Sequence, residues 1–306
     1  MKVDMRDAFF NGVYDCVKKD KNTLVLTADH GAFGLSRIER DFPKQFLNVG
    51  IAEQNMITLA GGLAKCGKIV YVYSINNFVT LRSLEQVNID LCAMNLNVNI
   101  IGVGAGFTYA TDGPTHQGMQ DMQSMMVLPN LSVYNVTDEI NSYKLAVLGH
   151  EQPGPKYFRI EKGILPKLYD DESTFLKGFS SAKKYQETVI ISTGYMTQVC
   201  QHIKNEISNV NVIDLYRVKP IDEELLAKEL KGVKNIIVVE ECTTSGGICE
   251  KIALVLAKNK IFCNFLPISV TDRHCHSYGT RELLHQKYGL DKEAILLKIK
   301  SFLRNK

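Results

Sequence analysis

The stretch VNIIGVG, residues 98–104, is a run of apolar and β-branched residues that is short for a helix. Such a run is typical of a strand buried on both faces of a parallel sheet. Similar runs at 23–28, 69–74, 131–136 and 156–160 each stand next to a segment of helix length. This alternation predicts an α/β fold with a mostly parallel sheet flanked by helices.

The pattern lapses once and then starts again, which predicts two domains. Around 166–185 the sequence is polar and contains Pro and Gly, so we predict a linker there. The first domain then spans 1–165, and a second, smaller α/β domain spans 186–306. Further strands are expected in the second domain at 188–193, 210–216, 235–241 and 261–268, and a helical segment follows them.

The composition fits a globular protein and argues against several classes of function. Of 306 residues, 45% are hydrophobic and 23% are charged, and the formal net charge is +3. No segment gathers Lys and Arg with aromatic residues as a nucleic-acid groove requires, so we expect no nucleic-acid partner. Residues 1–19 carry charges where a signal peptide needs an apolar core, and no uncharged stretch is long enough to span a bilayer. We therefore expect no membrane partner and a cytoplasmic location.

The eight cysteines stand mostly among apolar residues, and no CxxC pair occurs. This distribution is typical of reduced, buried thiols in a cytosolic protein. The densest group is Cys242 and Cys249 with the HCH triplet at 274–276, and its spacing fits no zinc pattern. We predict no metal site formed by this chain alone.

Two glycine-rich stretches follow predicted strands. In VNIIGVGAGFTYA, residues 98–110, Phe107 or Tyr109 stands where a dinucleotide-binding loop needs its third glycine, and Pro114 prevents the helix that should follow. In EECTTSGGICEKIALVLA, residues 240–257, the chain does pass from strand to helix. There the glycines favour a tight turn and close helix packing over anion binding.

The stretch NVGIAEQNM, residues 48–56, places one carboxylate, Glu53, among apolar residues. If Asn48 caps a helix, Glu53 lies in its first turn, where exposed amides stabilise an acid by up to ~1 kcal/mol. The apolar neighbours suggest another interpretation. A carboxyl in an apolar site has its ionised form disfavoured and can share a proton with a ligand nitrogen. The residues alone leave both interpretations open.

The stretch TYATDGPTHQG, residues 108–118, contains an Asp-Gly-Pro sequence that predicts a turn. It also gathers short polar groups, among them Asp112, His116 and Gln117, just after a predicted strand. Ligand sites of α/β proteins tend to lie on such loops.

Together these two stretches resemble the C-terminal half of the transketolases, the thiamine-diphosphate enzymes that move two-carbon ketol units between sugars. The related 1-deoxyxylulose-5-phosphate synthases carry especially similar stretches. The resemblance covers nearly the whole chain. It implies a thiamine-diphosphate pyrimidine-binding domain followed by a transketolase C-terminal domain.

The resemblance implies a role for Glu53. The matching glutamate hydrogen-bonds N1′ of the cofactor's aminopyrimidine and promotes the imino tautomer, so that the 4′-nitrogen takes the proton from the thiazolium C2. Ile75, Phe78 and Leu81 match the apolar slot for the aminopyrimidine ring, and Asp29 matches an acid near the cofactor. The spacing of Ile75, Phe78 and Leu81 also fits the buried stripe of a helix, and Asp29 could cap a strand end.

For the substrate, the resemblance implies that Asp112 and His116 contact the donor's hydroxyls and carbonyl region, with His116 also counted as catalytic. It implies that Arg159 holds a phosphate or carboxylate, which its planar fork suits, although a surface arginine is the alternative. Where transketolases place a histidine for the donor phosphate, this chain has Gly104. We therefore expect a donor whose tail differs from a usual sugar 5-phosphate, with His30 or a partner residue supplying the missing contact.

The half-site for the cofactor's magnesium and diphosphate is expected elsewhere. In the family a Gly-Asp-Gly followed by an Asn holds both, and this chain contains no GDG; the TDG at 111–113 belongs to the loop above. Magnesium diphosphate requires several oxygen ligands and amides. We expect a larger subunit that carries this half, an active site at the interface, an α2β2 assembly and a sugar or sugar-phosphate substrate.

Two other functions stay open on the sequence alone. The β subunit of a 2-oxo acid dehydrogenase or acetoin-cleaving enzyme shares the architecture and the glutamate, but the DGPTHQG loop favours ketol transfer. A non-catalytic regulatory subunit could also have kept the fold, although Glu53, Asp112, His116 and Arg159 argue against it. Fold alone does not decide between these functions.

Overall fold

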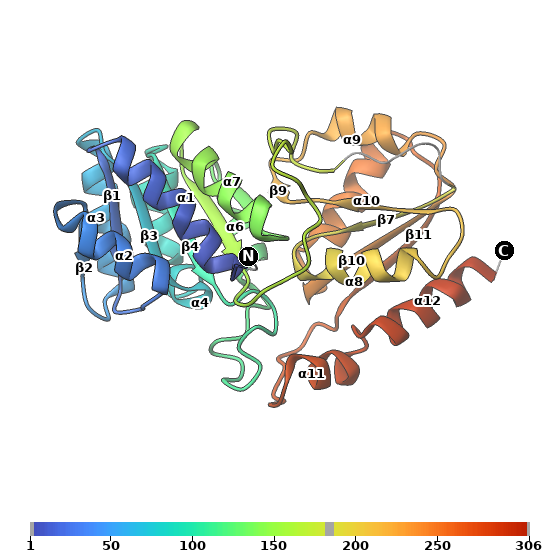
Figure 1. Ribbon diagram of the computed structural model, residues 1–306. Coiled ribbons are helices and arrows are strands. Elements are labelled where there is room, and N and C mark those ends of the chain that lie inside the picture. The colour runs from blue at the N-terminus through green and yellow to red at the C-terminus, as the bar shows by residue number, and fades with distance from the viewer. Residues whose placement is uncertain (1–2, 181–186, 305–306) are drawn as a thin grey trace.

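The computed structural model describes residues 3–180 and 187–304, which form two sheets, each flanked by helices (Figure 1). The first sheet has seven strands in the order β2-β1-β3-β4-β6-β5-β9, and β9 runs antiparallel to β5 while the other pairs are parallel. The second has four parallel strands in the order β11-β10-β7-β8. The predicted α/β fold is confirmed.

The strands are β1 (Thr23–Thr27), β2 (Phe46–Asn48), β3 (Ile69–Ile75), β4 (Val98–Val103), β5 (Ser132–Asn135), β6 (Lys156–Ile160), β7 (Thr188–Ser192), β8 (Val210–Asp214), β9 (Arg217–Lys219), β10 (Asn235–Thr243) and β11 (Asn264–Val270). The longer helices are α1 (Met5–Lys19), α2 (Phe33–Asp41), α3 (Glu53–Lys65), α7 (Glu139–Glu151), α8 (Tyr195–Lys204), α9 (Glu223–Leu230), α10 (Ile248–Lys258), α11 (Arg281–Tyr288) and α12 (Lys292–Arg304). Short helical pieces are η1 (Pro43–Gln45), α4 (Asn76–Val79), α5 (Leu84–Gln86), η2 (Val87–Cys92) and α6 (Asp121–Met126).

The strand expected at 98–104 is β4, which is buried along its whole length between β3 and β6. Val98 and Ile100 belong to the core on one face of the sheet, and Ile101 and Val103 belong to the core on the other. Each such side chain stabilises the fold by about 1.5–3 kcal/mol when fully buried. Because both faces are covered by helices, the strand needs no polar alternation, as the sequence indicated.

One strand from the second half of the chain belongs to the first sheet. β9 lies in the second half of the sequence, yet it pairs with β5 of the first sheet. Phe175 and Phe179, from the predicted linker, are both buried, and Phe175 packs on Tyr216. Linker residues 181–185 lie outside the described residues. The domain limits that we drew from the sequence stay a prediction, and they do not coincide with the division between the sheets.

The segment before Glu53 differs from the prediction. Asn48 does not cap a helix: it ends the short strand β2, and its side-chain oxygen accepts hydrogen bonds from the amides of Asp29 and Gly50. Helix α3 begins at Glu53 after Ala52, which provides no side-chain cap. Gly50, at φ +74°, makes the turn between strand and helix.

Other local predictions have mixed outcomes. The glycines at 246–247 do form a turn between β10 and α10, and the Glu240 carboxylate accepts hydrogen bonds from the amides of Ile248 and Cys249 at the start of that helix. The terminal helical segment is divided into α11 and α12 at Gly289, whose φ is +67°. Most cysteines are buried, as expected, and Cys66 is exposed.

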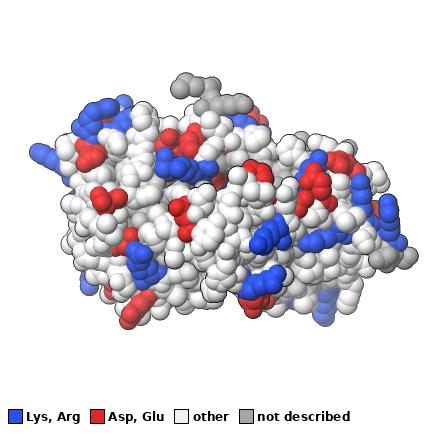
Figure 2. All heavy atoms as spheres, turned by 90° about the horizontal axis from the view of Figure 1, so that it is seen from below, with Lys and Arg blue, Asp and Glu red and all other residues white. Residues whose placement is uncertain are grey.

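On the face of the molecule seen in Figure 2, Lys and Arg are interspersed with Asp and Glu. Within the described residues, we find no helix with the length and apolar character that crossing a membrane would require.

Candidate functional site

The predicted site residues gather at one edge of the first sheet. Asp29 and His30 follow β1, Ile75 ends β3, and the loop of residues 104–118 follows β4. These strands are parallel neighbours, so their carboxyl ends meet at the same edge, where ligands bind in α/β sheets. The 104–118 loop leaves this edge and extends toward α11 (Figure 1).

Glu53 is buried at the first position of α3, with 4% of its surface exposed. Its Oε2 accepts a hydrogen bond from Arg82 Nη1 at 2.9 Å, in an ion pair whose arginine side chain is 44% exposed. The Arg82 guanidinium also lies 3.9 Å above the centre of the Phe78 ring. The carboxylate therefore has an opposite charge beside it that the sequence did not reveal, and Oε1 makes no hydrogen bond within the described residues.

Phe78 connects this pair to the predicted substrate loop. The His116 ring meets the Phe78 ring edge-on, with centroids 5.2 Å apart, and lies 6.1 Å from the ring of Tyr109. Glu53, Arg82, Phe78 and His116 thus follow one another along the sheet edge. Two residues predicted to be catalytic, Glu53 and His116, are brought to the same region by this row.

Two asparagines directly after β3 hold the 104–118 loop in place. Asn76 Nδ2 donates to the carbonyl of Gly104 at 2.7 Å, and Asn77 Nδ2 donates to the carbonyls of Thr115 and Gln117, each at 3.1 Å. Both side chains are buried. Sequence reasoning missed them, although an Asn-Asn pair at the end of an apolar strand is a signal that could have found them.

The expected pyrimidine slot is only partly assembled. Ile75, 8% exposed, ends β3, and Phe78 lies in the four-residue helix α4. Leu81 is 41% exposed and, with Gln54 and Arg82, lines a pocket of about 590 Å³ beside the Glu53 ion pair. The alternative interpretation as the buried stripe of a helix is wrong, because Ile75 belongs to a strand and Leu81 lies on the surface.

His30 lies among positively charged side chains. Its ring centroid is 5.3 Å from that of Tyr73, and its Nε2 is buried with no hydrogen-bond partner in the described part of the chain. Burial lowers the pKa of His30, and the nearby Arg6, Lys162 and His116 side chains lower it further. Lys162 follows β6 and Arg6 belongs to α1, so neither was identified from the sequence motifs.

Asp29 and Asp112 both lie on the surface. Asp29 has a left-handed backbone, φ +53°, and its carboxylate accepts a hydrogen bond of 3.4 Å from Asn48 Nδ2. Asp112 accepts a bond of 3.1 Å from the Thr111 hydroxyl. Both carboxylates remain accessible to a ligand, and their predicted roles stay predictions.

Arg159 is buried, so the alternative of a surface arginine is wrong. Only 3% of its side chain is exposed, its Nε donates to Asp121 Oδ2 at 2.9 Å, and its Nη2 donates to the carbonyl of Gly118 at 2.6 Å. These bonds bind the guanidinium to protein groups beneath the loop. The predicted anion-binding role of Arg159 stays a prediction, and this geometry gives it no support.

A metal site was not predicted for this chain, and the described residues contain no group of three His, Cys, Asp or Glu side chains placed to hold an ion. Cys242 is buried beside Arg159, and Cys249 donates weakly to the carbonyl of Val238.

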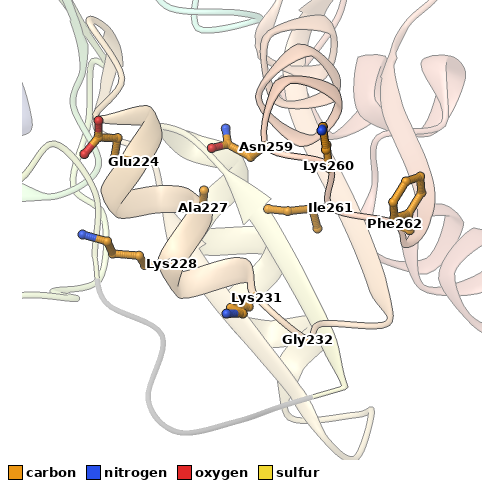
Figure 3. A pocket seen from close by; sticks show the side chains of 9 residues that line it. All are labelled: Glu224, Ala227, Lys228, Lys231, Gly232, Asn259, Lys260, Ile261 and Phe262. Atoms are coloured by element: carbon orange, nitrogen blue, oxygen red, sulfur yellow. The ribbon is translucent and has the colours of Figure 1, made fainter.

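A separate pocket of about 600 Å³ lies between α9 and residues 259–262 of the second half (Figure 3). None of the predicted site residues lines it.

The comparison with known families agrees with this arrangement. The family described as "Transketolase, pyrimidine binding domain" matches residues 1–167, and the family described as "Transketolase, C-terminal domain" matches residues 181–295. The chain belongs to the transketolase family. The resemblance that we drew from the two motifs is therefore confirmed, and with it the presence of two transketolase domains.

Transketolase relatives of the same length exist as separate chains. A "Putative transketolase C-terminal section" of Methanocaldococcus jannaschii is 31% identical, with 96% of this chain and 95% of the relative covered. A subunit of an apulose-4-phosphate transketolase of Phocaeicola vulgatus is 29% identical, with 95% and 94% covered. The chain also matches the C-terminal part of 1-deoxy-D-xylulose-5-phosphate synthases.

A solved structure described as "Split gene transketolase, inactive beta4 tetramer" superposes with a TM-score of 0.87 at 26% identity and covers 99% of both chains. This transketolase chain therefore has the fold and extent of a split transketolase C-terminal subunit.

Proposed function

We propose that this chain is the small subunit of a two-chain, thiamine-diphosphate-dependent enzyme that transfers a two-carbon ketol unit between sugars. The observation that carries the proposal is the row of Glu53, Arg82, Phe78 and His116 at the carboxyl edge of the first sheet. It combines a buried acid, an aromatic ring and a loop histidine, and a transketolase needs these groups on its pyrimidine side.

The residues at this edge fit the pyrimidine end of the cofactor. Glu53 Oε1 makes no hydrogen bond within the described residues, so it is available to a ring nitrogen, and Phe78 and the end of β3 offer apolar surface for a flat ring. When bound, thiamine diphosphate supplies the nucleophilic carbon that takes up the ketol unit. In this proposal Glu53 holds a proton at the pyrimidine nitrogen and orients the ring.

His116 and Asp112 are proposed to act on the donor sugar. The imidazole of His116 can donate to or accept from a hydroxyl, and its Nδ1 lies 2.9 Å from the Thr115 hydroxyl. That contact and the Phe78 ring limit the rotation of the imidazole. We propose that His116 exchanges a proton with the donor's hydroxyl or carbonyl oxygen, while Asp112 binds a hydroxyl.

The tail of the donor is proposed to be an anion that meets Lys162, His30 and Arg6. No ion pair involves Lys162 in the described part of the chain, and its Nζ lies 5.9 Å from the centre of the Tyr109 ring. Arg6, Lys162 and His116 all act on the pKa of His30, and we propose that Arg6 and Lys162 with His30 supply an anion site that does not depend on position 104. The relatives named for apulose 4-phosphate and for 6-deoxy-6-sulfofructose are consistent with an anionic tail other than a plain 5-phosphate.

The magnesium and diphosphate are proposed to be bound by a larger subunit with a Gly-Asp-Gly and a following Asn, in an α2β2 assembly in the cytoplasm. Two relatives are named as transketolase subunits, and the split-gene relative is described as an inactive β4 tetramer. We expect this chain to be inactive alone, since half of the cofactor site is on the partner.

The test is a donor panel on the assembled enzyme with magnesium and thiamine diphosphate present. We expect ketol transfer that requires both chains and the cofactor, and higher kcat/KM for ketoses with a 4-phosphate or a sulfonate tail than for xylulose 5-phosphate. If xylulose 5-phosphate is the best donor, the proposed tail specificity is wrong. If no ketose is a donor with both chains present, the proposed activity is wrong.

A further inference from the structure

The second half of the chain reaches the 104–118 loop through buried polar groups. Glu241 Oε1, at the end of β10, accepts a hydrogen bond from the amide of Phe107 at 3.3 Å. The carbonyl of Ser277 accepts from Gln117 Nε2 at 3.3 Å, at the other end of the loop. The Thr108 hydroxyl is hydrogen-bonded to Glu161 Oε2, which follows β6, at 2.5 Å. The loop is therefore held at both ends by groups outside it.

Arg281, the first residue of α11, joins the two acids. Its Nη1 and Nη2 donate to the carboxylate of Glu161 at 2.7 and 3.0 Å, and its Nε donates to Glu241 Oε1 at 3.1 Å. Nη2 also contacts the other oxygen of Glu241. Glu161 and Glu241 are both almost fully buried, so without the guanidinium two negative charges would lie together in a medium of low dielectric.

Further contacts fix this arginine in position. The Tyr195 ring lies 3.6 Å from the guanidinium carbon, and His285, one turn further along α11, is hydrogen-bonded to Glu241 Oε1. Glu241 also lies directly against Gly106, so that a methyl group at Gly106 would overlap the carboxylate. The approach of the acid to the loop backbone thus requires glycine at this position.

We propose that Arg281, Glu161 and Glu241 form a clamp by which the C-terminal half positions the 104–118 loop, and with it Asp112 and His116, for the reaction. These are positioning residues. Glu241 accepts from the loop's backbone, Glu161 accepts from the Thr108 hydroxyl, and Arg281 joins the two acids, so all three act on a substrate only through the loop. The consequence for catalysis rests on the proposed function, but the clamp itself does not. It gives the C-terminal domain, which contributes none of the predicted site residues, a defined role in the active site.

The first test uses the isolated chain and measures amide hydrogen exchange at residues 104–118. Arg281→Met removes the charge and keeps a long apolar side chain, and Arg281→Lys keeps the charge. Lys292→Met is the matched control, because it removes the cation that Lys292, in the neighbouring helix α12, contributes to an exposed ion pair with Glu206. We expect Arg281→Met to speed exchange of the loop amides at least about 10-fold, with Arg281→Lys intermediate, Lys292→Met without effect, and β4 and β7 protected as before.

The second test uses the assembled enzyme and the same variants. A displaced loop should lower kcat/KM for the donor by about 10²-fold in Arg281→Met, with partial recovery in Arg281→Lys. Cofactor affinity should change little, since Glu53 and Phe78 are not part of the clamp. Comparable losses in donor kcat/KM and in cofactor affinity would indicate general damage and would contradict a positioning role.

Unchanged exchange of the loop in Arg281→Met, or faster exchange spread equally over both sheets, would overturn the proposal. If Arg281→Met does not fold, the variants Thr108→Val and Gly106→Ala test the clamp in the same exchange measurement. They disturb the clamp from the loop side without removing a charge. If the wild-type assembly transfers no ketol unit, the proposed function fails, and the exchange measurement still decides whether the clamp exists.

Discussion

Glu53 and Arg82 form an ion pair of 2.9 Å at the carboxyl edge of the first sheet, with the carboxylate buried and the guanidinium partly exposed. The pair leaves one carboxylate oxygen available, and the same guanidinium covers the Phe78 ring. Arg82 therefore occupies surface next to the acid that a flat ligand would use. We expect Arg82 to move when the cofactor's ring packs on Phe78, while Glu53 stays in place at the start of α3.

Glu53→Gln should reduce turnover of the assembled enzyme by about 10²–10⁴-fold, because the amide keeps the shape of the side chain and cannot hold the proton. The fold should be retained, as judged by circular dichroism and a cooperative thermal transition. Glu39→Gln, at an exposed acid on α2, is the control and should keep wild-type turnover. Turnover within about twofold of wild type in Glu53→Gln would exclude the assigned role.

Arg82→Met should destabilise the isolated chain by about 1 kcal/mol, because it leaves the buried Glu53 carboxylate without its cation. The effect is limited by the exposure of Arg82, since solvent screens such a pair. Urea unfolding measures it. In the double variant Glu53→Gln/Arg82→Met the two losses should be far from additive, because the variants remove the same interaction. Simple additivity would mean that the ion pair contributes nothing to stability.

Lys162→Met should raise the KM for a donor with an anionic tail by about 10-fold and leave an uncharged donor unaffected, because it removes one charge-assisted contact. Added salt should reduce the difference between the wild type and the variant, since Lys162 is exposed. Lys144→Met, at a half-buried lysine whose Nζ donates to the carbonyl of Asp171, is the control. An equal loss for charged and uncharged donors would show that Lys162 does not bind the tail.

Acid should weaken the fold partly through Glu241. Burial alone would raise the pKa of Glu241, but the charges of Arg281 and His285 lower it to about 2. Since the unfolded value is about 4.3, Glu241 favours the folded state above that pH, and this contribution is lost as the pH falls toward about 2. Glu241→Gln should therefore show a flatter decline in the free energy of unfolding between about pH 5 and pH 2. Parallel declines in both proteins would contradict the assignment.

Much of the fold followed from local sequence patterns, and the side-chain pairings of the candidate site did not. The continuous apolar run of β4 is dictated by burial on both faces, and parallel strands bring their carboxyl ends together, so Glu53 and His116 could be expected at one edge. Arg82 and Lys162 come from other segments, and only tertiary contacts bring them to these residues. No periodicity records such contacts, and motif matching alone gave no indication that Asp121 binds Arg159 inside the protein.

The central claim is that this chain forms half of a two-chain thiamine-diphosphate site. The most direct measurement is to tag the chain, purify it from its own cells with magnesium and thiamine diphosphate present, identify the co-purifying protein by mass spectrometry, and assay ketol transfer by the isolated material. We predict a larger partner in equal amount, with a Gly-Asp-Gly and a following Asn, and transfer that depends on the cofactor and on Glu53. A chain that emerges alone, binds no cofactor and transfers no ketol unit would contradict the claim.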